Sequence, residues 1–189
     1  MYLTLGLQHI ADFKGYDHIL FIITLVAVYV IRDWKKILIL ITAFTIGHTL
    51  TLVLASFNIL SISGDWIEFL IPVTIVLTAL GNILQKKEQF SKKHHFYKYL
   101  LTLFFGLIHG LGFSNYLKSL LGSEDQLVGP LFSFNLGIEL GQIIIVSIFL
   151  FIGLVFINII GVKKRDWNIF FSGAGFGIAV ILIFERIPF

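Results

Sequence analysis

The sequence contains no cysteine, and its one methionine is Met1. Disulfides, thiolate metal sites and a cysteine nucleophile are therefore excluded, and a soft Cu(I) site is disfavoured. Charged residues are scarce as well: they make up 13% of the chain, against about 25% in a typical soluble domain. A metal ion bound here would have to be held by imidazole, carboxylate, amide or backbone oxygen.

Apolar residues are abundant instead, at 57% of 189 residues. They fall in blocks of about 16–28 residues, close to the 20 or so that a membrane-crossing helix needs. This pattern predicts an all-α fold, a polytopic membrane helix bundle that forms a single integral membrane domain over residues 1–189. Residues 1–15 are too short to cross and are expected to lie in the interface or dip into the bundle mouth. About six transmembrane helices are expected, near 16–31, 37–57, 66–85, 98–117, 130–158 and 168–185.

The basic residues gather in alternate loops. Eleven of the fourteen lysines and arginines lie in or beside the loops 32–36, 86–97 and 162–167. Short basic loops stay cytoplasmic, so both termini are predicted outside. Because topology accounts for the net charge of +3, no nucleic-acid partner is expected; the partner is the lipid bilayer.

Three ionisable residues fall near the middle of predicted spans. His48 and His109 each lie 11 residues, about 16 Å, from the inner end of their helices, and Glu139 lies nine residues, about 13 Å, from the outer end. In a hydrocarbon core of about 30 Å, these groups approach the midplane, where ionisable side chains usually face a bundle interior or a cavity. Asp17 and His18 begin the first span at the outer surface.

Other polar residues share helix faces with these groups. Asn135, Glu139 and Gln142 stand at i, i+4 and i+7, which places them on one stripe. Imidazole and carboxylate ligands suit a divalent transition metal such as nickel, zinc or cobalt. We therefore predict a metal site with the ligands His18, His48, His109, Glu139 and Asp17 and the accessory residues His9, Asp12, Asn135, Gln142 and Thr45.

Pairs of glycines at G-x-x-x-G spacing mark the last three spans. Small residues at this spacing let helices approach closely, within the bundle or in a homo-oligomer. The pairs are Gly106/Gly110, Gly137/Gly141 and Gly173/Gly177.

Four ordered blocks of this sequence resemble the HupE/UreJ family of small bacterial membrane proteins, and the resemblance covers nearly the whole chain. The blocks are Gly-Tyr-Asp-His at 15–18, Phe-Thr-Ile-Gly-His-Thr-Leu-Thr-Leu at 44–52, Phe-Gly-Leu-Ile-His-Gly-Leu-Gly-Phe at 105–113 and Phe-Asn-Leu-Gly-Ile-Glu-Leu-Gly-Gln at 134–142. The resemblance implies a bacterial cytoplasmic membrane protein that carries nickel or a related metal, with ligands at the Asp17, His18, His48, His109 and Glu139 positions. Nickel-linked members carry a His-Pro pair before the first block, where this chain reads Ala11-Asp12 with His9 nearby. The chain thus looks more like the second, less characterised branch of the family.

Three functions are compatible with these residues. A permease would pass its ion inward along Thr42, Thr102, Thr78 and Asn82. A zinc-type hydrolase acting on a lipid or membrane peptide would hold its metal on the histidines and use Glu139 or Asp17 as general base. In a structural protein the polar groups would only join helices. The resemblance favours the permease, or another form of metal handling, over an enzyme.

Overall fold

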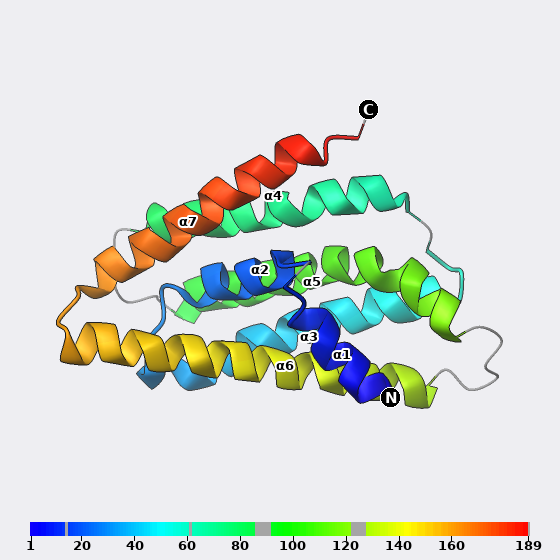
Figure 1. The fold of residues 1–189 in the computed structure, drawn as a ribbon, viewed down its shortest axis with the longest axis horizontal. Helices are drawn as coiled ribbons and strands as arrows, with labels where there is room; N and C mark the ends of the chain where they lie inside the picture. The colour runs from blue at the N-terminus through cyan, green and yellow to red at the C-terminus, as the bar shows by residue number, and fades with distance from the viewer. Residues whose placement is uncertain (14, 61, 86–91, 122–127, 189) are drawn as a thin grey trace.

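A computed structural model describes the chain except residues 14, 61, 86–91, 122–127 and 189, and every regular element of the described part is a helix. The helices lie side by side in an elongated bundle (Figure 1). This confirms the predicted all-α membrane bundle. The helices are α1 (Tyr2–Ile10), α2 (Asp17–Val26), α3 (Trp34–Ser56), α4 (Gly64–Ile83), α5 (Lys92–Leu121), α6 (Val128–Leu154) and α7 (Lys164–Glu185), with a 3-10 turn η1 (Ile31–Asp33) and a π-helical turn η2 (Val155–Ile159).

Five of these helices are long and apolar enough to cross a membrane, and they match the last five predicted spans. They are Ile31–Ser56, Gly64–Ile83, His95–Ser114, Val128–Ile159 and Lys164–Glu185. Both ends of the chain lie toward the same end of the bundle in Figure 1, and the turns that carry Arg32 and Lys163 lie at the other end. This arrangement agrees with the prediction that both termini lie on one side and these two basic turns on the other. Lys86 and Lys87, which also supported it, lie outside the described residues.

The first predicted span, 16–31, is not one crossing helix, because α2 has only 10 residues. The run after it stays apolar, so hydropathy does not reveal where the helix ends. Asn82 of α4 contacts this end of α2. Its Nδ2 donates to the carbonyl oxygen of Thr24 at 2.6 Å, an acceptor that a continuing α-helix would offer to the amide of Val28. A contact from another helix thus accompanies the end of α2, where the Thr24 carbonyl also accepts the backbone N–H of Ala27 at 3.4 Å.

The missing depth is supplied by α1. This helix enters the bundle obliquely from the outer end, and α2 starts near the point where α1 stops (Figure 1). The two helices have 9 and 10 residues, about 14 and 15 Å, and because α1 is oblique the depth that they cover together is less than the sum of these lengths. We describe α1 and α2 as one discontinuous crossing, broken at residues 11–16.

Close backbone contacts at glycines fix both halves of the bundle. A Cβ at Gly6 or Gly137 would collide with backbone where α1 crosses α6, and one at Gly47 or Gly106 would collide with backbone between α3 and α5. Two of the three predicted G-x-x-x-G pairs therefore serve packing within the chain. The third pair, Gly173/Gly177, is open: among the described residues, no atom lies within 4 Å of where a Cβ would stand on either glycine.

Candidate metal centre

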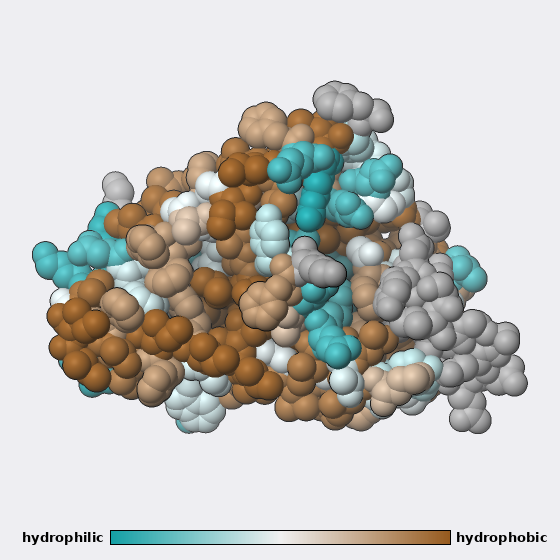
Figure 2. Space-filling view, in the orientation of Figure 1, coloured by the Kyte–Doolittle hydropathy of each residue, from teal (hydrophilic) through white to brown (hydrophobic). Residues whose placement is uncertain are grey.

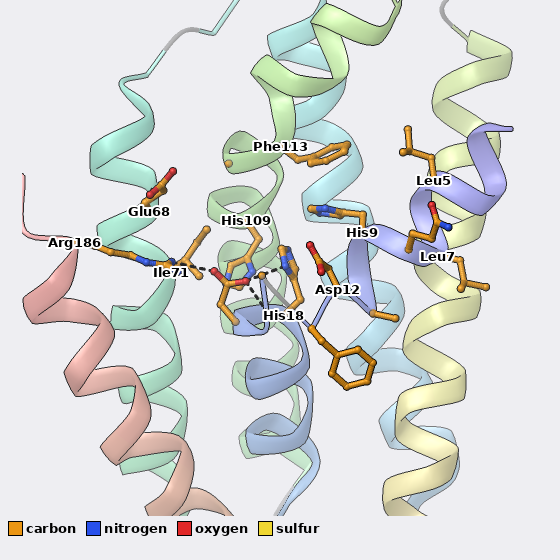
Figure 3. A pocket seen from close by; sticks show the side chains of 16 residues that line it. Leu5, Leu7, His9, Asp12, His18, Glu68, Ile71, His109, Phe113 and Arg186 are labelled. Atoms are coloured by element: carbon orange, nitrogen blue, oxygen red, sulfur yellow. Dashed lines mark hydrogen bonds and ion pairs between the residues drawn. The ribbon is translucent and has the colours of Figure 1, made fainter.

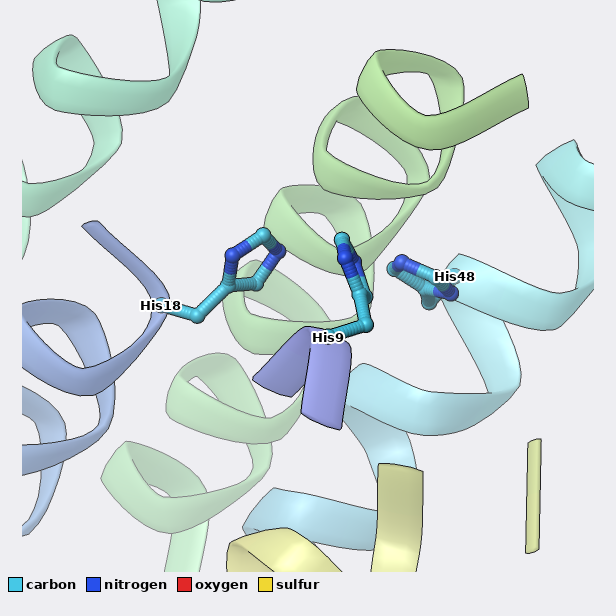
Figure 4. Close-up of side chains that lie close together, drawn as sticks. All are labelled: His9, His18 and His48. Carbon is cyan, nitrogen blue, oxygen red and sulfur yellow. The ribbon is translucent and has the colours of Figure 1, made fainter. Parts of the chain in front are cut away.

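Three histidines meet where the discontinuous crossing is broken. His9 lies in the last turn of α1, His18 in the first turn of α2, and His48 in the middle of α3. One ring nitrogen from each lies within 4.8 Å of the others, and the rings face one another in Figure 4. Two nitrogens that share an ion at about 2.1 Å each are at most about 4.2 Å apart. The three rings are therefore nearly close enough to bind one ion.

The hydrogen bonding of these rings fits a metal site. Nε2 of His9, Nε2 of His18 and both nitrogens of His48 are buried and make no hydrogen bond of good geometry among the described residues, although the Asn135 side chain also interacts with His48. Buried polar side-chain atoms are nearly always bonded, so each exception calls for an explanation such as an ion or a catalytic role. Three neutral imidazoles with a further position open to water or substrate are a known arrangement for divalent zinc. The residues present thus fit a divalent transition-metal ion.

Asp17 lies behind His18 rather than among the three rings. Its Oδ1 is 3.3 Å from Nδ1 of His18 and also accepts the backbone N–H of His18 at 3.0 Å. A histidine that gives one nitrogen to a carboxylate presents the other in a fixed orientation, as metal-binding histidines usually do. Asp17 was predicted as a ligand, and this geometry suits it to orienting His18.

His109 borders the group without belonging to it. Its ring centroid is 5.2 Å from that of His18, and the rings of Phe21 and Phe44 lie 5.0 and 5.1 Å away. Its Nε2 lies 3.2 Å from the hydroxyl of Thr74, and its Nδ1 has no partner among the described residues. Nδ1 is thus the nitrogen left to take part in binding.

Glu139 is not brought to the histidines. Its Oε1 accepts a hydrogen bond from Thr42 at 2.6 Å, and Thr45 donates to Gln142 at 2.8 Å, so these pairs join α3 to α6. Thr42 precedes His48 by six residues, about 9 Å along α3. The remaining accessory residue on this stripe, Asn135, donates to the carbonyl of Leu131. The predicted stripe exists, but its carboxyl group lies well inward of the histidines.

A cavity of about 960 Å³ gives access to the site. Figure 3 shows the side chains that converge on it from α1, α2, α4, α5 and the end of α7, and Figure 2 shows a hydrophilic patch in the middle of this otherwise largely apolar face. Among the residues that the structure describes, three acidic residues and one basic residue line the cavity, namely Asp12, Asp17, Glu68 and Arg186. The carboxyl groups among these described residues suit the approach of a cation.

The predicted inward path is not an open row of ligands. Thr102 donates to the carbonyl of Lys98 and Thr78 to that of Thr74, each at 2.8 Å, so both hydroxyls are used within their own helices. Asn82 bonds the Thr24 carbonyl and Ser172, and it accepts from Lys98 at 3.3 Å. The described groups on this side therefore hold α2, α4, α5 and α7 together.

Replacing Asn82 by alanine should lower the melting temperature in detergent by several degrees. The change removes the shared partner of Thr24, Lys98 and Ser172, and a buried group left without its bond costs about 1–3 kcal/mol. For a chain of this length, about 1 kcal/mol corresponds to roughly 2–4 °C. The exposed Asn158→Ala is the matched control. Equal melting of the two variants would contradict the joining role of Asn82.

Sequence reasoning undervalued two residues. His9 was expected to be accessory, yet it is one of the three grouped histidines. Arg186 was expected only to anchor the last span at the interface, yet it lines the cavity and bonds Asp17 at 3.0 Å. The N-terminal segment was expected to lie near the site because it carries His9 and Asp12, but nothing in the sequence linked Arg186 to a group 169 residues away.

Comparison with known proteins agrees with this picture. The model of the family described as HupE / UreJ protein matches residues 1–185. No curated protein and no solved structure matched the chain. Since the family match covers almost all of the sequence, this multi-pass membrane protein belongs to the HupE / UreJ family.

Proposed function

We propose that this metal-handling membrane protein is a permease for a divalent transition-metal ion, with nickel, zinc and cobalt as the candidate ions. One observation carries the proposal: three histidines with unpartnered buried nitrogens meet at the break of a discontinuous crossing. Membrane transporters commonly place ion sites at such breaks, because half-helix ends and freed backbone groups there can contact the ion.

The ends of the two short helices suit a cation. The C-terminal end of a helix carries partial negative charge, and a cation near it gains about 0.3–1 kcal/mol. His9 lies in that last turn of α1. The start of α2 has the opposite polarity, and Asp17 in its first turn offsets it. The break therefore favours a positive ion between the helices.

The proposed route starts in the cavity. Asp12 and Glu68 line it and draw the hydrated ion inward. The histidines then replace water in the coordination shell, which requires neutral imidazole. Further movement requires a change at Asn82, since the ammonium of Lys98 beside it opposes a second positive charge.

Flux into liposomes tests the proposal. The purified protein should give saturable uptake of Ni²⁺, Zn²⁺ or Co²⁺, reported by a metal-sensitive dye inside the vesicles. His48→Ala should abolish this uptake, because His48 contributes a ring nitrogen to the group of three. Arg165→Met, altered at an exposed residue, should transport like the unchanged protein. Tight metal binding without flux would refute the permease.

A membrane-embedded, zinc-type hydrolase is the second candidate, and the cavity is what favours it. A space of about 960 Å³ exceeds what one hydrated ion fills, and three histidines with an open position form a catalytic type of zinc site. The general base first considered, Glu139, is bonded to Thr42, and Asp17 is engaged by both oxygens. This candidate gains support only if metal is bound without flux.

A further inference from the structure

Arg186 reaches from the far end of the chain into the metal centre. It follows α7 directly, and its Nη1 donates to Oδ2 of Asp17 at 3.0 Å (Figure 3). The side chains of Arg186 and Asp17 are only 26% and 11% exposed. A well-shielded pair of this kind differs from exposed surface ion pairs, which contribute at most about 1 kcal/mol.

The two oxygens of Asp17 have separate partners. Oδ2 is taken by Arg186, while Oδ1 accepts the backbone N–H of His18 and lies 3.3 Å from its Nδ1. With both oxygens held, the carboxylate cannot rotate without breaking one of these contacts. His18 is therefore held with Nδ1 toward Asp17. Its Nε2, a buried nitrogen without a hydrogen-bond partner among the described residues, is then available to bind a metal ion.

A simple anchoring role at the membrane interface explains less. Glu185, the neighbouring residue, is exposed, as an interfacial anchor would be, whereas Arg186 turns inward to line the cavity. A positive charge beside a cation site also opposes binding by direct repulsion. The position of Arg186 is explained if Arg186 influences metal binding through the Asp17 carboxylate, to which it is bonded.

We infer that Arg186 is a positioning residue for metal binding, which acts through Asp17 to fix the tautomer and orientation of His18. The inference rests on the proposed metal site. Outer partners of metal-binding histidines typically change metal affinity by about 10–100-fold when removed. Here the contacts run from the Arg186 guanidinium to the Asp17 carboxylate and from that carboxylate to the His18 imidazole.

Calorimetric titration of the metal-free protein with Zn²⁺ and with Ni²⁺ tests this order of action. Arg186→Met should weaken binding by about 10–100-fold, and Arg186→Lys, which keeps a cation that can reach Asp17, should recover part of the loss. In an Asp17→Asn background, Arg186→Met should add no further loss, because the path through the carboxylate is already broken. Arg165→Met, at the opposite end of α7, should bind like the unchanged chain.

The outcomes separate the inference from the proposed function. If the unchanged chain binds metal and Arg186→Met binds equally well, the positioning role is refuted and the metal site stands. Independent, additive losses from Arg186→Met and Asp17→Asn would also refute action through Asp17. If the unchanged chain binds neither ion while its helix content is intact, the metal site and the inference both fail.

Discussion

Replacing His48 by leucine should abolish metal binding and leave the metal-free protein at least as stable as the unchanged chain. His48 is completely buried, and its ring nitrogens make no hydrogen bond of good geometry among the described residues, although the Asn135 side chain interacts with it. A buried polar group without a partner costs about 1–3 kcal/mol. Leucine fills a similar volume, so it removes this cost and one metal ligand in the same step.

Two measurements on each variant check this result. Metal content is determined by mass spectrometry after purification without chelator or affinity metal, and thermal unfolding is followed after the metal is stripped. The metal affinity of His48→Leu should fall by more than about 100-fold, which is the largest loss typical for residues that only hydrogen-bond a metal ligand. His95→Leu is the control, since His95 is buried but stacks on Tyr29 and Tyr99 instead.

The pair of readouts distinguishes a ligand from a histidine that only fills the core. If His48→Leu keeps its metal, the three grouped histidines are not the ligand set. If the metal-free variant unfolds well below the unchanged chain, His48 makes stabilising contacts that its unpartnered nitrogens do not suggest. Only loss of metal with retained stability agrees with a site that evolved for binding at some cost to folding.

Depth along a continuous helix was the reliable guide from sequence. α3 and α5 do run through the bundle, so counting residues from their ends correctly placed His48 and His109 among the helices. The same count failed to place Glu139 with them. Depth along a helix does not say which residue of the neighbouring helix a side chain meets. Glu139 bonds Thr42 rather than approaching His48, and this depends on how α3 and α6 pack.

The break in the first crossing could not be read from the sequence. Residues 19–31 are almost uniformly apolar, so hydropathy gives no sign of where α2 ends. Once a full helix is assumed over 16–31, Asp17 and His18 fall at the outer surface, and His9 falls outside the bundle. In the structure, His9 and His18 are instead grouped with His48 from the middle of α3. The assumed helix hid this grouping, and His9 was therefore judged accessory.

Replacing Gly6 by valine should weaken metal binding as severely as removing His9 itself. A Cβ at Gly6 would overlap the carbonyl of Phe134, and a reciprocal contact joins Gly137 to the backbone of Leu3. Neither backbone segment can yield, so α1 must move away from α6 and carry His9 with it. Calorimetric titration should show that metal affinity falls by more than about 100-fold. The change moves His9, a proposed ligand, away from the ion, and this should cost more than the loss of a residue that only bonds a ligand.

A matched glycine and a double variant separate this effect from general disruption. Gly173→Val adds the same side chain on α7 where nothing lies within 4 Å among the described residues, so it should bind metal normally. Gly6→Val combined with His9→Ala should bind no more weakly than either change alone, because both act by removing the same imidazole. Fully additive losses would mean that α1 supports the site by some route other than His9. Coincident losses would tie the close packing of α1 on α6 directly to the position of one ligand.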